Sequence, residues 1–314
     1  MTPSVSIIIP CRNEEKFIGK CLKMISEQDY PKEKMEVLVV DGASEDRTKE
    51  VIEELKIKNL KLKINVLDNP KKYTPFGLNI GIKNSRGEVI IRMDAHAGYE
   101  KDYISKCLKY LEEYNADNVG GIIKTLPAEN TLIAKAIAVC LSHPFGAASD
   151  FRLKPAGLKL VDTVFGGCYK REVFEKIGLF NENLIRSQDL EFNSRLKKSG
   201  GKILLVPDIV SYYYPKTNLK DFFWHNFQDG IWAILPLKFV KMPFKLRHYL
   251  PLLFVLTLPL SVWPYILACL FFSLQISLKE KNIRLFFLMP LAFSVRHFGY
   301  GLGSIIGLLK LIYQ

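Results

Sequence analysis

Apolar stretches that end in an aspartate recur along the first hundred residues, and they constrain the fold more than any other feature. The sequence predicts four strands, at 4–10, 35–40, 62–67 and 89–93, and an aspartate directly follows each of the last three. Helical patterns separate them, and this alternation predicts an α/β fold with a doubly wound, mainly parallel sheet. Asp41, Asp68 and Asp94 each follow a strand. Aspartate is common in turns, but carboxyl ends of parallel strands meet at one edge, so we expect a shared polar cleft there.

Asp94 and His96 stand two residues apart after the strand at 89–93. In extended chain, residues i and i+2 point to the same face, so both side chains can reach one divalent cation. A carboxylate beside an imidazole suits Mg²⁺ or Mn²⁺ that is held mainly by the phosphates of a substrate. The alternative is that the two residues simply begin a loop.

An uncharged run from Tyr249 to Leu278 exceeds the roughly 20 residues that cross a bilayer. We predict that it is one transmembrane helix, bent by its prolines. A second apolar stretch, Leu285–Leu309, contains Arg296 and His297. A charge at that depth is costly, so we expect Arg296 to contact a protein carboxylate or an acceptor phosphate. Glycines spaced four residues apart favour close helix packing in this stretch; they are Gly299, Gly303 and Gly307.

A basic segment precedes the uncharged run. It contains Lys238, Lys241, Lys245 and Arg247. Such a segment is typical of chain that lies on anionic headgroups, although a plain basic linker has the same composition. Its positive charge favours a cytoplasmic catalytic part. We therefore predict a catalytic domain at 1–235 and a membrane part at 236–314, in a multi-pass protein of the cell membrane.

The composition excludes several other classes of protein. The net charge is +12, but neither zinc-finger spacing nor an aromatic RNA-binding motif is present, so nucleic acid is not an expected partner. The six cysteines are scattered without a C-x-x-C pair, which is typical of free thiols. The sequence does not indicate an oligomeric state.

Several motifs occur in an order that resembles family 2 glycosyltransferases. They are Ser6–Glu15, Val39–Asp46, Arg92–Ala97, Gly166–Phe174 and Ser187–Glu191. The family has the GT-A nucleotide-sugar-binding fold. Together with the apolar C-terminal part, the Asp-Ala-His version of the third motif is most similar to the membrane-bound succinoglycan-biosynthesis type.

The resemblance implies a donor site at the predicted sheet edge. Its nucleotide would be surrounded by Pro10, Arg12, Glu14 and Asp41, with Asp41 bonded to the base or ribose of UDP. Asp94 and His96 take the place of the family's D-x-D metal motif, and the histidine replaces the second aspartate. Asp68, which follows the third strand, is added to the substrate-binding set.

The resemblance also implies a catalytic base, Asp189, in the family's E-D motif. Gln188 replaces the glutamate of that motif and is included among the expected substrate-binding residues. Glu191 is the nearest competitor, but two residues further along a helix it would face away from Asp189. Gly166 and Gly167 suit a close approach of the backbone to a sugar.

A segment from Gln228 to Trp232 resembles the Q-x-x-R-W motif of processive synthases. Ile231 stands in place of its arginine, which argues against processive synthesis. Trp232 is expected to stack on a sugar face, with core packing as an equal alternative.

These features predict inverting transfer of a sugar from a nucleotide donor, expected to be UDP-linked, to a lipid-linked glycan at the membrane. A polyprenyl-phosphate sugar synthase is one alternative. Its acceptor phosphate is already ionised and needs a base less than a hydroxyl does. A non-catalytic nucleotide-sugar-binding membrane protein is the alternative from another class.

Overall fold

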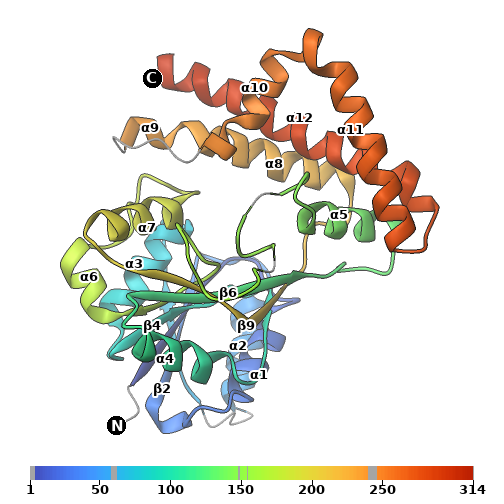
Figure 1. Cartoon of the computed structure of the whole chain (residues 1–314). Helices are drawn as coiled ribbons and strands as arrows, with labels where there is room; N and C mark the ends of the chain where they lie inside the picture. Colours follow the sequence, from blue (N-terminus) through green and yellow to red (C-terminus); the bar gives the residue numbers. More distant parts are fainter. Residues whose placement is uncertain (1–3, 58–61, 148, 154, 240–245, 314) are drawn as a thin grey trace. The chain divides into compact units, whose positions relative to one another are not determined.

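The structure is a computed structural model that describes residues 4–57, 62–147, 149–153, 155–239 and 246–313. Its contacts gather into two compact units in the chain drawn in Figure 1. The first consists of Met1–Lys124 and Lys154–Tyr213, and the second of Thr125–Leu153 and Tyr214–Gln314. The chain therefore enters the second unit twice. The predicted division at residue 235 separates functions rather than compact units, and it stays a prediction.

The first unit is built on a sheet that has nine strands over the described ranges, in the order β3-β2-β1-β4-β8-β6-β9-β5, with β7 paired to β9. The strands are β1 (Val5–Cys11), β2 (Met35–Asp41), β3 (Lys63–Asp68), β4 (Val89–Arg92), β5 (Ala97–Tyr99), β6 (Asn118–Thr125), β7 (Lys159–Leu160), β8 (Cys168–Lys170) and β9 (Ile203–Tyr213). β1 to β4 pair in parallel, and β8 continues the sheet antiparallel to β4. The predicted α/β fold is confirmed.

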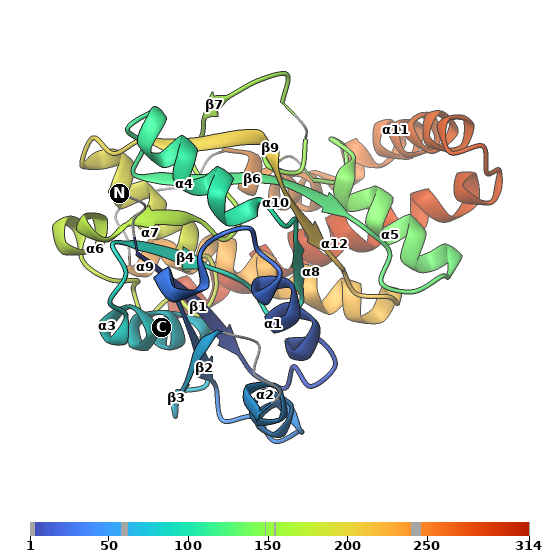
Figure 2. The same ribbon diagram turned by 90° about the horizontal axis from the view of Figure 1, so that it is seen from below.

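Helices cover both faces of this sheet. They are α1 (Ile18–Ser26), α2 (Thr48–Ile57), α3 (Thr74–Asn84), α4 (Tyr103–Glu113), α6 (Arg171–Ile177) and α7 (Gln188–Lys198). Ile7 shares a core with Ile18 of α1. Ile8 points the other way, and its Cγ2 lies 2.4 Å from where Gly81 of α3 would carry a Cβ. Successive strand residues thus serve opposite layers, and Figure 2 shows α3 across the sheet from α1 and α2.

Register sets the polar edge of the sheet. Cys11 pairs with Asp41, and Asp41 pairs with Asp68, so the ends of β1, β2 and β3 lie level with one another. β4 pairs with β1 from the other side through Ile8 and Arg92. The carboxyl ends of the four parallel strands therefore meet as predicted.

The second unit is helical over its described residues. It contains α5 (Leu132–Ser142), α8 (Leu219–Ile234), α9 (Pro236–Phe239), α10 (Leu250–Leu256), α11 (Leu258–Lys279) and α12 (Arg284–Tyr313). By length and composition alone, α11 and α12 are suited to cross a membrane. Residues 240–245 of the predicted basic interfacial segment, which include Lys241 and Lys245, lie outside the described residues.

The prediction of one helix over Tyr249–Leu278 is wrong, because the run divides at Thr257 into α10 and α11. Pro259 stands in the first turn of α11. Proline lacks a backbone N–H and fits a helix start, but it disfavours helical backbone in the residue before it. The apolar run is therefore a short helix followed by a long one.

Helices α8 and α12 lie side by side (Figure 1) and touch through their backbones. A Cβ added to Gly303 would lie 2.0 Å from the carbonyl oxygen of Phe227, and one added to Gly299 would lie 3.0 Å from that of Phe223. Gly307 faces α8 in the same way. The four-residue spacing of these glycines does permit close packing, as predicted.

Arg296 finds other partners than those predicted. Its guanidinium donates hydrogen bonds to the carbonyl oxygen of Gly146 and, over 2.6 Å, to Oδ1 of Asn226. The adjacent His297 has Nε2 2.9 Å from the carbonyl oxygen of Phe145. In place of the expected protein carboxylate, Arg296 meets neutral oxygens of the loop after α5 and of α8. The expected contact with an acceptor phosphate stays a prediction.

We expect Gly303→Ala to destabilise the second unit, although alanine favours a helix over glycine by about 1 kcal/mol. The added Cβ meets the carbonyl oxygen of Phe227 at 2.0 Å, and overpacking typically costs about 1–3 kcal/mol. Thermal unfolding in detergent measures the change. Gly157→Ala is the control, since nothing lies within 4 Å of its added Cβ. Equal stability of the two variants would contradict the contact.

Candidate active site

The loops that follow β1 and β2 are bound to each other. The backbone N–H of Asn13 donates to Oγ of Ser44 over 2.9 Å, and that of Glu14 donates to Oγ1 of Thr48 over 2.7 Å. The backbone N–H of Glu15 donates to Asp46 over 3.1 Å. These bonds fix both loops at the carboxyl edge of the sheet.

Asp41 is fully buried at this edge. Its Oδ2 accepts from the N–H of Ser44 at 3.1 Å and lies 3.4 Å from Nζ of Lys49. Among the described residues, Oδ1 has no hydrogen-bond partner. The Asp41 charge adds to burial in raising the pKa of Cys11 to about 12. A buried carboxylate oxygen without a donor is costly, so a ligand N–H or O–H suits this position.

Other predicted nucleotide contacts have different surroundings. Pro10 packs beside α3, since a Cβ added to Gly77 of that helix would lie 3.3 Å from the Cβ of Pro10. Arg12 lies 3.7 Å from the carboxylate of Glu45. Asp68 is exposed and accepts from Nζ of Lys49 over 2.8 Å, a bond that raises the pKa of Lys49. Lys49 thus bridges the ends of β2 and β3.

Asp94 lies in a turn rather than on the strand, because β4 ends at Arg92 and the N–H of Ala97 donates to the carbonyl oxygen of Asp94. The extended geometry predicted for Asp94 and His96 is therefore wrong. Nε and Nη2 of Arg92 both donate to Oδ1 of Asp94 over 3.1 Å. The N–H of Asp94 donates to the hydroxyl of Tyr99 over 2.8 Å. These bonds orient the carboxylate.

His96 is held by another of the predicted residues. Its Nδ1 lies 2.9 Å from Oε1 of Glu14, and its ring meets that of Tyr213 edge-on at 6.3 Å. Glu14 thus orients the imidazole. Over the described ranges, no three His, Cys, Asp or Glu side chains gather closely enough to hold a metal by themselves. If Asp94 and His96 bind a metal, they supply two ligands, and the others would come from a bound substrate or from water.

Gly166 and Gly167 lie against the end of β4. Both have positive φ angles, 69° and 104°. A Cβ on Gly166 would lie 2.8 Å from the carbonyl oxygen of Arg92, and the N–H of Arg92 donates to the carbonyl oxygen of Gly167 over 3.0 Å. The glycines are therefore required for backbone packing beside the Arg92–Asp94 pair, whatever their role toward a sugar.

Asp189 stands in the first turn of α7, as predicted. Burial by itself would lower the pKa of Arg92. The negative charges of Asp94 and Asp189 outweigh this effect and raise the pKa above its usual range. Arg92 therefore links the predicted metal ligand electrostatically to the predicted base. Gln188 is buried, and Ser187 before it has a left-handed φ of 59°.

Glu191 is occupied elsewhere. Its carboxylate accepts from Nε of Arg195 over 2.6 Å and from Nη2 over 3.0 Å. Arg195 also donates to the carbonyl oxygens of Ile177 and Leu179. Glu191 is 4% exposed. This ion pair anchors α7 and makes Glu191 a poor candidate for the base.

Trp232 belongs to α8 of the second unit and is half-buried. Its predicted contact with a sugar stays a prediction.

The structure adds three residues to the site that were not predicted from the sequence: Arg92, Lys49 and Tyr99. An arginine inside the apolar run 89–93 was a signal for the first. Nothing in the spacing of Lys49 or Tyr99 indicated their partners, because the sheet register and a turn bring them there.

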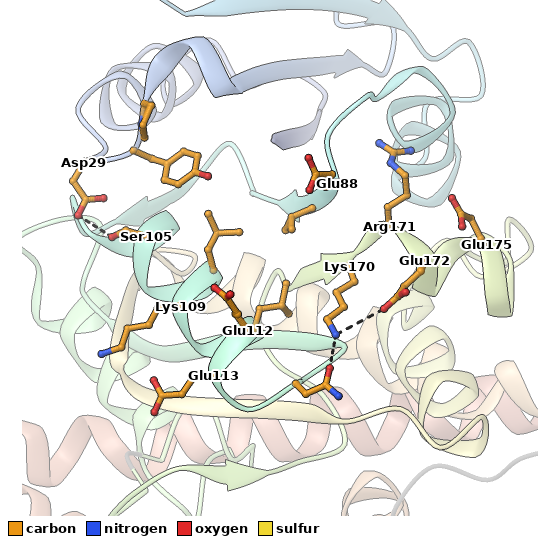
Figure 3. Close-up of a pocket in the computed structure, with 16 residues that line it drawn as sticks. Asp29, Glu88, Ser105, Lys109, Glu112, Glu113, Lys170, Arg171, Glu172 and Glu175 are labelled. Carbon is orange, nitrogen blue, oxygen red and sulfur yellow. Dashed lines mark hydrogen bonds and ion pairs between the residues drawn. The ribbon is translucent and has the colours of Figure 1, made fainter. Parts of the chain in front are cut away.

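A pocket of about 1340 Å³ lies at the start of β4, whereas Asp94 follows the end of that strand. Figure 3 shows its charged rim. Several of the polar side chains there are paired: Ser105 donates to Asp29 over 2.8 Å, and Lys170 donates to Asn115 over 2.7 Å. The pocket is distinct from the residues described above.

Sequence comparison decides the family. Residues 6–178 match the profile of Glycosyl transferase family 2. The chain belongs to this family. The glycosyltransferase is 33% identical, over 98% of its length and 97% of the relative's, to a dolichyl N-acetyl-alpha-D-glucosaminyl phosphate 3-beta-D-2,3-diacetamido-2,3-dideoxy-beta-D-glucuronosyltransferase of Methanococcus voltae. It is 26% identical to the succinoglycan biosynthesis protein ExoA of Rhizobium meliloti, over 88% and 86% of the two chains.

Solved structures share the fold of the glycosyltransferase. A mannosyltransferase from Pyrobaculum calidifontis, in complex with GDP-Man and Mn²⁺, matches 99% of this chain and 88% of its own, with a TM-score of 0.68 and 19% identity. Staphylococcus aureus TarS 1–349 in complex with UDP matches 99% and 93%, with a TM-score of 0.53 and 17% identity. The predicted GT-A fold is confirmed.

We expect Asp41→Ala to weaken binding of a uridine nucleotide, because a hydrogen bond to a charged group is worth about 1.5–3 kcal/mol, or roughly 10- to 100-fold in Kd. Calorimetry on the full chain in detergent measures the loss. Glu53→Ala is the control, since Glu53 is an exposed carboxylate that pairs with Lys56 and belongs to no predicted site. Unchanged affinity in Asp41→Ala would remove Asp41 from the donor site.

Proposed function

We propose that this glycosyltransferase moves a sugar, with inversion, from a UDP-linked donor to a lipid-linked glycan in polysaccharide or glycoconjugate biosynthesis. The observation that carries the proposal is the edge of the parallel strands. There, a buried Asp41 oxygen lacks a partner among the described residues, and Arg92 holds Asp94. The name of the Methanococcus voltae relative, which specifies a dolichyl-linked sugar phosphate, supports a lipid-linked acceptor.

The donor diphosphate would lie near Asp94 and His96. Arg92 holds Oδ1 of Asp94, which leaves Oδ2 as the second donor atom of that carboxylate. Glu14 holds Nδ1 of His96, so Nε2 is the ring atom that suits a cation. These two residues would hold Mg²⁺ or Mn²⁺ together with substrate phosphates. When bound, the ion supplies positive charge to the departing diphosphate.

Asp189 would remove the proton from the acceptor hydroxyl. An alcohol is a weak nucleophile, and a base within hydrogen-bond reach accelerates its attack. A single base on the side opposite the leaving group gives displacement with inversion. Because Glu191 is paired with Arg195, Asp189 is the carboxylate of this helix start that suits the role.

The apolar helices α11 and α12 support attachment to the cell membrane. We place the first unit in the cytoplasm, because the cations near 238–247 favour that side. Attachment would hold the site near lipid-linked acceptors and raise their effective concentration. Packing, rather than length, decides whether these helices cross the bilayer.

We expect Asp94→Ala to abolish transfer and His96→Ala to raise the Mn²⁺ or Mg²⁺ concentration needed for half-maximal activity. His96→Asp should retain activity and shift the preference toward Mg²⁺, which favours oxygen ligands. Activity after chelation, titrated with each ion, measures this. Asp208→Asn, an exposed carboxylate that contacts Lys106, is the control. Full wild-type activity in excess chelator would rule out the metal.

We expect Asp189→Asn to lower kcat on a hydroxyl acceptor by about 10²–10⁴-fold, the usual contribution of a general base. A polyprenyl-phosphate acceptor should tolerate the change, so activity on phosphate alone would favour the synthase alternative. Glu191→Gln is the control, because it should lower the melting temperature through Arg195 more than it lowers kcat. An active Asp189→Asn enzyme on a hydroxyl acceptor would exclude Asp189 as the base.

A further inference from the structure

The turn between α11 and α12 is bonded to α5. Oε2 of Glu280, directly after α11, lies 2.9 Å from Nζ of Lys135 in the first turns of α5. Both side chains are about one-third exposed. The position of Lys135 relative to a membrane therefore fixes the position of this turn.

Lys135 cannot be across a bilayer from β6. Only Leu126–Thr131 and the start of α5 separate the two, and this segment is irregular, exposed and contains Glu129. Irregular backbone does not occur in contact with lipid hydrocarbon, because its polar groups would lack partners. Moreover, the 11 residues of α5 extend only about 16 Å, half of a hydrocarbon core of roughly 30 Å.

The start of α11 lies on the same side of the bilayer as β6 and Lys135. Between β9 and α11, α8 has exposed Lys220 and Asp221 and an ion pair, 3.4 Å, between His225 and Asp229. α10 has seven residues and is about 10 Å long. The sequence between them adds Lys241 and Lys245. None of these segments suits a crossing, so α11 begins and ends on one side.

The second half of α12 lies on this side of the bilayer as well. Gly299 and Gly303 place its backbone against Phe223 and Phe227 of α8, next to the polar residues of that helix. Midway along α12, Arg296 is bonded to the loop after α5 and to α8. A spanning α12 would carry these polar neighbours into the hydrocarbon, at a cost of several kcal/mol for each charge that is not compensated.

One face of α11 carries a stripe of largely exposed apolar side chains. Leu260, Trp263, Leu267 and Leu278 are 67–85% exposed, and Leu270 and Leu274 are 41% and 47% exposed. Their spacing of three and four residues puts them on one helix face. The other face packs inward: the ring of Phe272 lies 4.8 Å from that of Phe145 in the loop after α5.

We propose that α11 and α12 form a hairpin that lies along the membrane on the side of the first unit without crossing it, with the Leu260–Leu278 stripe buried in the leaflet that faces that side. The occupant of this apolar face is a lipid bilayer. The inference rests on the proposed membrane attachment but replaces the multi-pass arrangement predicted from the sequence. It places the turn at Lys279–Arg284 on the side where the donor binds.

Cysteine labelling tests the proposal on the full chain in sealed vesicles of one orientation. Lys281→Cys marks the exposed turn, Lys198→Cys marks the first unit, and Leu267→Cys marks the stripe. The six natural cysteines are buried, which keeps the background low. With a membrane-impermeant maleimide, we expect the first two to react from the same side of the vesicles and the third to react from neither side.

Flotation and transfer activity of each variant distinguish failure of the proposed membrane attachment from failure of the proposed hairpin arrangement. If Lys281→Cys reacts only from the side opposite to Lys198→Cys while the protein floats and remains active, the hairpin crosses the bilayer and only this inference falls. If the unmodified chain does not float with vesicles, the membrane attachment and the hairpin fall together. Reaction of Leu267→Cys in intact vesicles would also overturn the burial of the stripe in lipid.

Discussion

The ion pair between Arg92 and Asp94 is the interaction on which the site depends. β4 ends at Arg92, so the side chain of Asp94 is oriented by the guanidinium that holds one of its oxygens. The backbone of the same arginine is bonded to Gly167, and its charge interacts with Asp189. One residue therefore connects three motifs that are spread along the chain from Arg92 to Asp189.

Local pattern predicted the parts of the site that sheet geometry alone determines. Buried strands ending in Asp41 and Asp68 indicated a polar edge, because parallel register leaves no other arrangement for them. The orientation of Asp94 and His96 was mispredicted, since a turn stabilised by Tyr99 replaces extended chain there. The partners of Lys49 and Arg92 depend on tertiary contacts that no spacing in the sequence encodes.

The C-terminal part shows the limit of hydropathy as evidence. Length and composition place α11 and α12 among helices able to span a bilayer, but they do not report what covers each face. The glycines that contact α8, and the bonds from Arg296 to neutral oxygens, appear only when the helices are seen packed. Apolar sequence indicated contact with lipid, whereas packing bears on the depth and direction of that contact.

The chain enters its second unit twice, and this affects how the protein can be divided. A cut near residue 235 leaves α5 and α8 without α12, so the glycine contacts of α8 and the buried Asn226 lose their partners. Removing α12 would uncover apolar surface of α5 and α8, so the fragment would not become more soluble. A soluble catalytic fragment requires two changes at once: an end near Tyr213 and a short linker in place of Thr125–Leu153. The second unit thus consists of an internal insertion, Thr125–Leu153, and a C-terminal segment, Tyr214–Gln314, which pack together.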